Sequence, residues 1–241
     1  MIGGKKTKIK KRLSREKNNG AFLRRRKYGG FSFIESMVAV VVLSTGIIVS
    51  VSLISKALQQ TLDSRNQVIA GLLAEEGVEL VRNIRDNNWA SGLGSFTAKG
   101  LNAAGGTRHC RIDTTFNYST DSMADPLPNK KCGLTNFVQG NSPSFQLYTD
   151  NTTGLYSYAP FDLSGVATPT ANQTPTRFYR KVCLNWDGAT TETIYSIVVW
   201  DINNSVAASQ GTCGNPTGIE TFCKVANKCV YSKTIMTQWG E

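Results

Sequence analysis

The sequence predicts an α+β fold in which one long N-terminal helix packs on a C-terminal antiparallel β-sheet head. Three observations lead to this expectation. An uncharged run of twenty residues, Ser36 to Ser55, is long enough for a helix of about 30 Å. Apolar residues then recur at helical spacing as far as Trp89. From Ala90 onward the composition changes to Gly, Asn, Thr and Ser, with short strand-like segments between them.

The chain accordingly divides into four segments. Residues 1–30 are a basic leader that is expected to be removed, residues 31–55 a membrane-spanning half-helix, residues 56–89 an amphipathic half-helix, and residues 90–241 an extracytoplasmic β head. The leader contains twelve Lys and Arg and a single acid, Glu16, which is a net charge of +11 against +10 for the whole chain. The basic character of the chain is therefore a property of the leader.

The position of this basic leader favours membrane insertion. A basic tail can also indicate a nucleic-acid-binding patch. Directly before an apolar run, however, the positive-inside rule explains it better and keeps the leader in the cytoplasm. A secretory signal fits less well, because its apolar region would be about 7 to 15 residues long and the cleavage site would follow it.

One helix is expected from Phe31 to about Asn88, a length of roughly 87 Å. No proline interrupts this segment. Three glycines cost about 1 kcal/mol each relative to alanine and are candidates for bending: Gly46, Gly71 and Gly77. The amphipathic half carries a predicted apolar stripe that should face the head: Leu58, Leu62, Ile69, Leu72, Leu73, Leu80 and Ile84.

Six segments of the head are typical of β-strands: residues 108–118, 145–149, 155–159, 177–186, 193–200 and 229–239. Asp187 and Gly188 predict a hairpin between the fourth and the fifth of them. An antiparallel sheet on the outer half of the helix would bury the helical stripe. Strand aromatics usually enter the core, and we expect this, rather than an exposed adhesive patch, for Tyr148, Tyr156, Tyr158, Trp186 and Trp200.

Glu35 is the one charged residue at the start of the apolar run. A charged side chain costs roughly 2.5 to 3.5 kcal/mol at the bilayer centre and less towards the surface. Glu35 is either a first-turn acid favoured by the helix dipole or a carboxylate that needs a counter-ion. Cleavage between Gly30 and Phe31 would create an ammonium group four residues before Glu35.

The segment Gly30-Phe31-Ser32-Phe33-Ile34-Glu35, behind a basic leader and before an apolar helix, resembles the processing signal of a type IV prepilin. The resemblance implies a type IV pilin-like fold and cleavage after Gly30 by a prepilin peptidase. It further implies N-methylation of Phe31 and pairing of Glu35 with the N-terminus of a neighbouring subunit. Ser32 stands where many pilins have threonine.

Two further features are similar to minor rather than major pilins. Many major pilins break this helix with proline, whereas the first proline of this chain is Pro126. Residues 74–86 also resemble a helix of minor-pilin-like proteins. The resemblance thus implies a structural, non-enzymatic function as a minor pilin that assembles through its helix into a type IV pilus.

The same resemblance sets the expected partners and location. The partners are the prepilin peptidase, other pilin subunits, the pilus assembly platform and membrane lipids. Nucleic acid would be contacted only through an assembled filament, and no cofactor is expected. The protein would be a single-pass membrane protein before assembly and part of an extracellular filament afterwards. The alternatives are a pseudopilin of a type II secretion or DNA-uptake system, a single-pass anchored extracellular binding domain and, least favoured, an anchored enzyme.

All six cysteines lie beyond the expected span: Cys110, Cys132, Cys183, Cys213, Cys223 and Cys229. In an exported domain they predict disulfides, with buried thiols and a metal site as alternatives. The preferred pairs are Cys110–Cys132 and Cys213–Cys223 as loop closures, which leaves Cys183–Cys229 across adjacent strands. The sequence contains no CxxC motif, so the cysteine spacing does not resemble that of a zinc site. His109 is the single histidine, and neither a nucleophile elbow nor a phosphate loop lies near it. We expect neither catalytic residues nor a metal site.

The processing signal generates the first prediction. Mass spectrometry of the protein purified from membranes should find N-methyl-phenylalanine at Phe31 as the first residue. Gly30→Leu should leave the leader attached, because it places a bulky side chain at the cleavage point. An intact Met1 on the wild-type protein, in cells that contain the peptidase, would contradict the processing signal and favour a plain membrane anchor.

Overall fold

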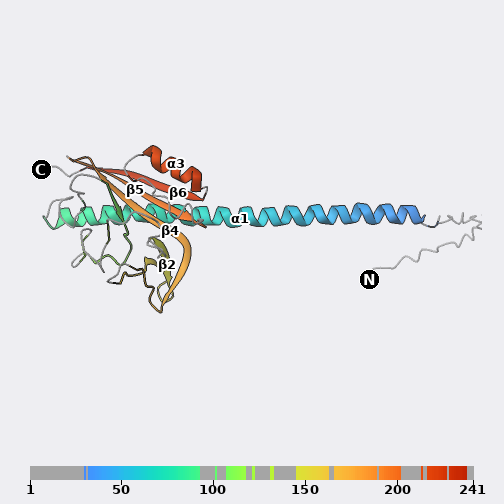
Figure 1. Ribbon diagram of the computed structural model, residues 1–241, viewed down its shortest axis with the longest axis horizontal. Coiled ribbons are helices and arrows are strands. Elements are labelled where there is room, and N and C mark those ends of the chain that lie inside the picture. The colour runs from blue at the N-terminus through green and yellow to red at the C-terminus, as the bar shows by residue number, and fades with distance from the viewer. Residues whose placement is uncertain are drawn as a thin grey trace, which may run out of the picture. The chain divides into compact units, whose positions relative to one another are not determined.

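Helix α1 runs without interruption from Phe33 to Ala90 (Figure 1). The structure is a computed structural model that describes residues 30, 32–92, 101, 107–117, 121–122, 131–132, 145–162, 166–188, 190–201, 213, 216–226 and 228–237. The chain forms two compact units, Met1–Ile54 and Ser55–Glu241, and α1 contributes to both. The single long helix is confirmed and continues through all three glycines, ending two residues beyond the expected Asn88.

The head contains a six-stranded antiparallel sheet with the order β3-β2-β4-β5-β6. Its strands are β1 (Thr107–Cys110), β2 (Gln146–Asp150), β3 (Tyr156–Tyr158), β4 (Gln173–Trp186), β5 (Thr191–Trp200) and β6 (Cys229–Thr237). One edge of β4 is shared, because β2 pairs with its first half and β1 with its second half. The predicted combination of a long helix with an antiparallel sheet is therefore confirmed.

Strands form at all six expected places, but the first is shorter than expected. β1 ends at Cys110, and the prediction that it continues to residue 118 is wrong. The chain turns at Asp113, whose Oδ1 accepts hydrogen bonds from the backbone N and the hydroxyl of Thr115, at 3.0 and 2.6 Å. This Asx-type turn competes with strand pairing. Residues 118, 238 and 239 lie outside the described part of the chain.

The hairpin between β4 and β5 has the predicted turn. Oδ1 of Asp187 accepts hydrogen bonds from the backbone N atoms of Thr190 and Thr191, at 3.1 and 3.0 Å. Gly188 adopts a φ of +88°, a backbone conformation that residues other than glycine rarely adopt. Asp187 and Gly188 therefore reverse the chain as expected from their residue types.

The sheet lies between α1 on one face and helix α3 (Pro216–Ala226) on the other (Figure 1). Successive residues of β5 point to opposite faces. The core on the α1 face includes Val78, Val81, Ile84, Val182 and Ile194. The core on the α3 face includes Tyr195, Ile197, Val199, Ile219 and Phe222. Each face of the sheet is thus covered by a helix, and α3 is an element that sequence reasoning missed.

The face of α1 that contacts the sheet differs from the predicted stripe. Leu73 and Ile84 are buried as expected, but Leu58, Leu62 and Leu72 are 61%, 58% and 62% exposed, and Ile69 and Leu80 are half-buried. The contact face instead contains several small residues: Ala70, Ala74 and Gly77, beside Leu73, Val78 and Val81. Small side chains let the helix axis approach the sheet, which a stripe of leucines would hold further away.

Gly77 marks the closest approach of α1 to the sheet. A Cβ atom at this position would overlap the hydroxyl of Ser196 and lie 3.1 Å from its Cβ and 3.3 Å from Cδ of Arg180. Gly71, six residues earlier, has nothing within 4 Å of such an atom. Glycine is therefore required at 77 for packing, and not for bending.

Arg180 lies at the centre of this contact and is fully buried. Its guanidinium donates hydrogen bonds to the carbonyl oxygens of Leu73 in α1 and Ile112 after β1, at 3.2 and 2.6 Å. It also forms an ion pair with Glu76 at 3.4 Å and contacts the hydroxyl of Tyr158 at 3.3 Å. Such a set of acceptors is what makes a buried charge tolerable.

Glu192 is the opposite case, a buried acid whose carboxylate has no hydrogen-bond donor among the described residues. Its side chain is fully buried, and neither carboxylate oxygen has a hydrogen-bond partner among the described residues. Burial raises the pKa of Glu192 from 4.5 to about 8, and the nearby charge of Arg108 offsets only part of this effect. The folded head therefore holds a proton on Glu192 at neutral pH.

Replacing Gly77 by alanine should destabilise the head. Overpacking costs about 1 to 3 kcal/mol and the gain in helix propensity returns about 1 kcal/mol, so Gly77→Ala should lower the free energy of unfolding by about 1 kcal/mol. Gly71→Ala is the matched control and should be neutral or stabilising. Denaturant unfolding of the full chain in detergent measures both, and equal stability of the two variants would contradict the close approach. Adding Ser196→Ala to Gly77→Ala should restore part of the loss.

Glu192 should make stability fall as the pH rises. Between about pH 4.5 and about pH 8 the folded head keeps a proton that the unfolded chain has lost, so the free energy of unfolding decreases across this window. Glu192→Gln removes this ionisation. The Tm of the variant should therefore exceed that of wild type increasingly from about pH 5 to about pH 8. Glu75→Gln, at an exposed acid of α1, is the control, and parallel pH curves for wild type and Glu192→Gln would contradict the prediction.

Candidate functional site

The first turn of α1 carries the residues expected to direct processing and assembly. Gly30 and Ser32 are exposed, and the first helical hydrogen bond runs from the N–H of Ser36 to the carbonyl of Ser32 at 3.1 Å. Ser32 therefore occupies the N-cap position, for which serine is favoured. Phe31, the expected methylation site, lies outside the described residues.

Glu35 is exposed in the first turn of α1, three residues after the N-cap. This spacing matches a capping box, in which the glutamate would accept a hydrogen bond from the N-cap N–H. Within residues 30 and 32–92, however, the carboxylate of Glu35 makes no hydrogen bond or ion pair. The carboxylate lies at the positive end of the helix dipole, but within these residues no hydrogen bond or ion pair holds it in place.

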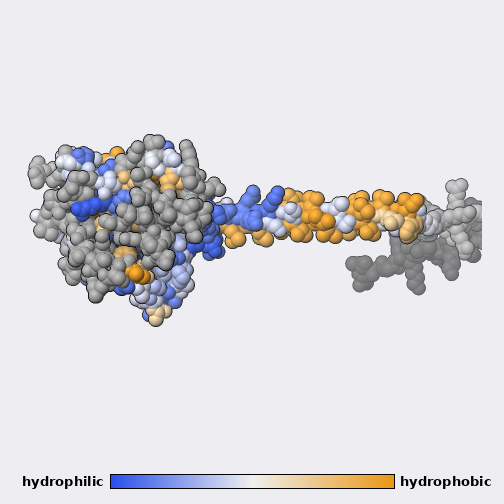
Figure 2. Space-filling model, in the orientation of Figure 1, coloured by the Kyte–Doolittle hydropathy of each residue, from blue (hydrophilic) through white to orange (hydrophobic). Residues whose placement is uncertain are grey.

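The half of α1 that lies in the first unit exposes all of its side chains. The exposed fractions of its large apolar residues range from 55% at Ile47 to 77% at Phe33. Figure 2 shows the resulting apolar surface along this part of the helix. An apolar surface that surrounds a helix on all sides is typical of a helix buried in lipid or among other helices.

Several hydroxyl groups within this half, those of Ser44, Thr45 and Ser50, are satisfied by the helix backbone itself. Ser44 donates to the carbonyl of Val41 at 3.0 Å, Thr45 to the carbonyls of Val41 and Val42 at 3.0 and 2.9 Å, and Ser50 to the carbonyl of Gly46 at 2.8 Å. In a hydrocarbon environment no water is present to replace these partners. These hydroxyls therefore do not prevent burial of the helix in an apolar medium.

By length and composition, α1 could span a membrane. Its apolar part lies near the N-terminus, where it also has the exposed surface just described. The expectation of a membrane-spanning half-helix is supported at this coarse level. The orientation of the helix in a membrane rests on the charges of the basic leader, of which residues 1–29 lie outside the described residues.

All six cysteines of the head form disulfides. The expected pair Cys110–Cys132 is confirmed, with a Cα–Cα distance of 4.0 Å. The other two expected pairs, Cys213–Cys223 and Cys183–Cys229, are wrong. The structure instead joins Cys183 to Cys213 and Cys223 to Cys229, at Cα–Cα distances of 5.3 and 5.0 Å.

Strand order explains the correction. The expected pair Cys183–Cys229 assumed that β4 and β6 are adjacent, but β5 lies between them. Cys183 pairs across the ladder with Tyr195, whereas Cys229 pairs with Val199, four residues further along β5. Helix α3 brings Cys223 to the start of β6. This cysteine therefore forms its disulfide with Cys229, at a sequence separation of only 6.

The remaining candidates of the head are mainly structural. Tyr148, Tyr158 and Trp200 are buried, and Tyr156 and Trp186 are half-buried, so these aromatics belong to the core as expected. His109 is half-buried on β1, with Nδ1 3.4 Å from Sγ of Cys213. Among the described residues no group of three His, Cys, Asp or Glu side chains is arranged to hold a metal ion.

Sequence reasoning missed the buried charges of the central strands. Arg180 and Lys181 are both fully buried in the middle of β4. Two consecutive cations on a strand indicate that one faces each side of the sheet, but their burial follows only from the helices that cover both faces. Pro216, at the first position of α3, was a signal for that helix.

No protein-family model, curated protein or solved structure matches the chain.

Proposed function

We propose that this chain is a minor structural subunit of a type IV pilus. In this proposal it is inserted in the membrane, cut after Gly30 by a prepilin peptidase and assembled through the first half of α1. The observation that carries the proposal is the coincidence of the Gly30-Phe31 motif and Glu35 with a helix whose apolar side chains are exposed on every side. Such a helix requires an apolar surrounding on all faces, which first lipid and then neighbouring subunits supply.

Assembly in this proposal depends on one ion pair between subunits. Cleavage leaves an amine at Phe31, one helical turn before Glu35 in the same chain. Repeating one heterologous contact generates an open helical filament and not a closed ring. If this contact places Glu35 of each subunit beside the amine of its neighbour, both charges are neutralised within the apolar bundle. The lack of a local partner for Glu35 among residues 30 and 32–92 supports this role.

The head has a separate task in the proposed function. It must stay folded outside the cytoplasm, where disulfides persist. Its three disulfides and its two-sided core support that location. A domain of this kind can cap or decorate a filament, and the membrane-spanning half can be exchanged between lipid and filament without unfolding the head.

Glu35 provides the test of this proposal. Glu35→Gln keeps the size of the side chain and removes its charge, so each neighbouring amine would be buried without a partner at a cost of roughly 3 to 5 kcal/mol. Membrane insertion should be unchanged, whereas incorporation into filaments should fall by at least about a hundredfold. The measurement is an immunoblot of filaments sheared from cells that express the other pilus subunits.

Glu75→Gln is the matched control for this experiment, because it removes an exposed acid from the head half of the same helix. It should assemble like wild type. Equal recovery of Glu35→Gln and wild type in the sheared fraction would mean that Glu35 is only a first-turn helix acid. Absence of the wild-type protein from filaments, together with normal insertion, would favour an anchored binding domain.

A further inference from the structure

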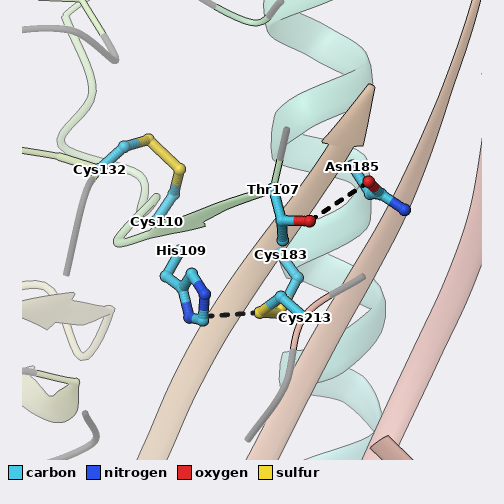
Figure 3. Close-up of a disulfide and its surroundings, with 7 residues drawn as sticks. All are labelled: Thr107, His109, Cys110, Cys132, Cys183, Asn185 and Cys213. Atoms are coloured by element: carbon cyan, nitrogen blue, oxygen red, sulfur yellow. Dashed lines mark hydrogen bonds between the residues drawn. A yellow bond between two sulfur atoms is a disulfide. The ribbon is translucent and has the colours of Figure 1, made fainter. Parts of the chain in front are cut away.

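The Cys183–Cys213 disulfide differs from the other two in its surroundings. His109 lies opposite Cys183 in the β1–β4 ladder, and its ring faces Sγ of Cys213, with Nδ1 at 3.4 Å (Figure 3). Lys181 precedes Cys183 by two residues in β4, so the two side chains leave the same face of the strand roughly 7 Å apart. The chain has a single histidine, so no other disulfide can have this neighbour.

Both nitrogen groups are held in an environment that disfavours positive charge. Burial, and to a lesser degree the charge of Lys181, lowers the pKa of His109 to about 4. Burial lowers the pKa of Lys181 to about 7. A negative charge placed beside either group would favour its protonated form. A cysteine thiolate, which forms only when the disulfide opens, would be such a charge.

We propose that Cys183–Cys213 is a thiol–disulfide exchange site whose reaction partner is a dithiol oxidoreductase, and that His109 and Lys181 stabilise the thiolates that this exchange releases. Cys213 is the point of attack, because it is 7% exposed whereas Cys183 is fully buried. The proposal concerns the chemistry of the head and is independent of filament assembly.

Two displacements make up the reaction. A thiolate of the dithiol attacks Sγ of Cys213, the protein S–S bond breaks, and Cys183 leaves as a thiolate on the strand face that it shares with Lys181. The partner is now joined to Cys213 by a mixed disulfide. The partner's second thiol, ionised to a thiolate, attacks the partner sulfur of this mixed disulfide, and Cys213 leaves as a thiolate beside Nδ1 of His109. The partner is oxidised to a disulfide, and the protein gains two electrons. The two protons lost when the partner's thiols ionise are taken up by His109 and Lys181, which then face the two thiolates. The reverse sequence closes the disulfide.

Cys110–Cys132 is a built-in comparison for this site. It is attached to the same β1–β4 ladder on the opposite face, and its cysteines are similarly buried, at 0% and 5% exposure. Solvent access is therefore alike for the two disulfides, whereas only Cys183–Cys213 has the imidazole in contact with its sulfur. A difference in their reactivity would have to come from these neighbours.

The experiment follows reduction of the folded full chain in detergent, with dithiothreitol as the dithiol. Samples are alkylated at intervals, and peptide mass spectrometry quantifies each cysteine pair. With a Brønsted coefficient of about 0.5, a leaving thiol whose pKa is about two below the usual value of about 8.5 departs about tenfold faster. Cys183–Cys213 should therefore open about tenfold faster than Cys110–Cys132.

Two variants separate chemical assistance from packing. His109→Gln keeps a polar side chain that cannot be protonated, and it should slow the second displacement, in which Cys213 leaves the mixed disulfide with dithiothreitol, about tenfold without affecting Cys110–Cys132. Thr107→Val, on the same face of β1 but away from the sulfur atoms, should react like wild type. After selective reduction, the pH of half-maximal alkylation of Cys213 should lie below about 8.5 in wild type and rise towards about 8.5 in His109→Gln.

Three outcomes would overturn the proposal. They are equal rates for Cys183–Cys213 and Cys110–Cys132 in wild type, an unchanged pH of alkylation in His109→Gln, and opening of Cys183–Cys213 only at the rate of global unfolding measured by circular dichroism. A variant that loses its fold would be recognised by the same circular dichroism measurement. Lys181→Met then serves in its place, and it should raise the pH of half-maximal alkylation of Cys183.

Discussion

The buried guanidinium of Arg180 ties the helix of the head to its sheet. It is held by the carbonyl oxygens of Leu73 and Ile112 and by the carboxylate of Glu76, and so joins α1, the segment after β1 and the centre of β4. A buried cation that lost these partners would cost several kcal/mol, so the three segments have to dock together. Gly77 makes the docking feasible, because a side chain at this position would overlap Ser196 and come into close contact with Arg180.

The sheet separates two chemical environments. Its α1 face is an aliphatic core that encloses the protonated Glu192, and its α3 face holds aromatic residues, His109 and the Cys183–Cys213 disulfide. One ladder, β1 with β4, anchors disulfides on both faces, since adjacent residues of β1 point in opposite directions. The alternation of a single strand thus decides that one disulfide has an imidazole neighbour and the other does not.

The first unit of the chain is under a different constraint. Within its described residues, the apolar half of α1 buries none of its large side chains, and the hydroxyls of Ser44, Thr45 and Ser50 bond to its own backbone. A surface of this kind is stable only in lipid or against other apolar helices. The described part of the head, in contrast, has an apolar core on each face of its sheet.

The sequence by itself determined what depends on neighbouring residues. The long helix, the positions of the strands and the turn at Asp187 and Gly188 all follow from local periodicity and backbone preferences. Cys110–Cys132 was accessible as a loop closure. The apolar half of α1 was likewise legible, because membrane length is a property of the chain alone, whereas the processing motif around Gly30 stays a prediction.

Only the tertiary structure decided which segments meet. The partners of Cys183 and Cys229 depend on β5 lying between β4 and β6, which no local pattern records. The buried face of α1 follows from the close approach at Gly77, and not from the leucine spacing. The burial of Arg180 and Glu192 likewise arises from the helix and strands that cover them. Residue types limit what a segment can form, but burial and pairing belong to surfaces assembled from distant segments.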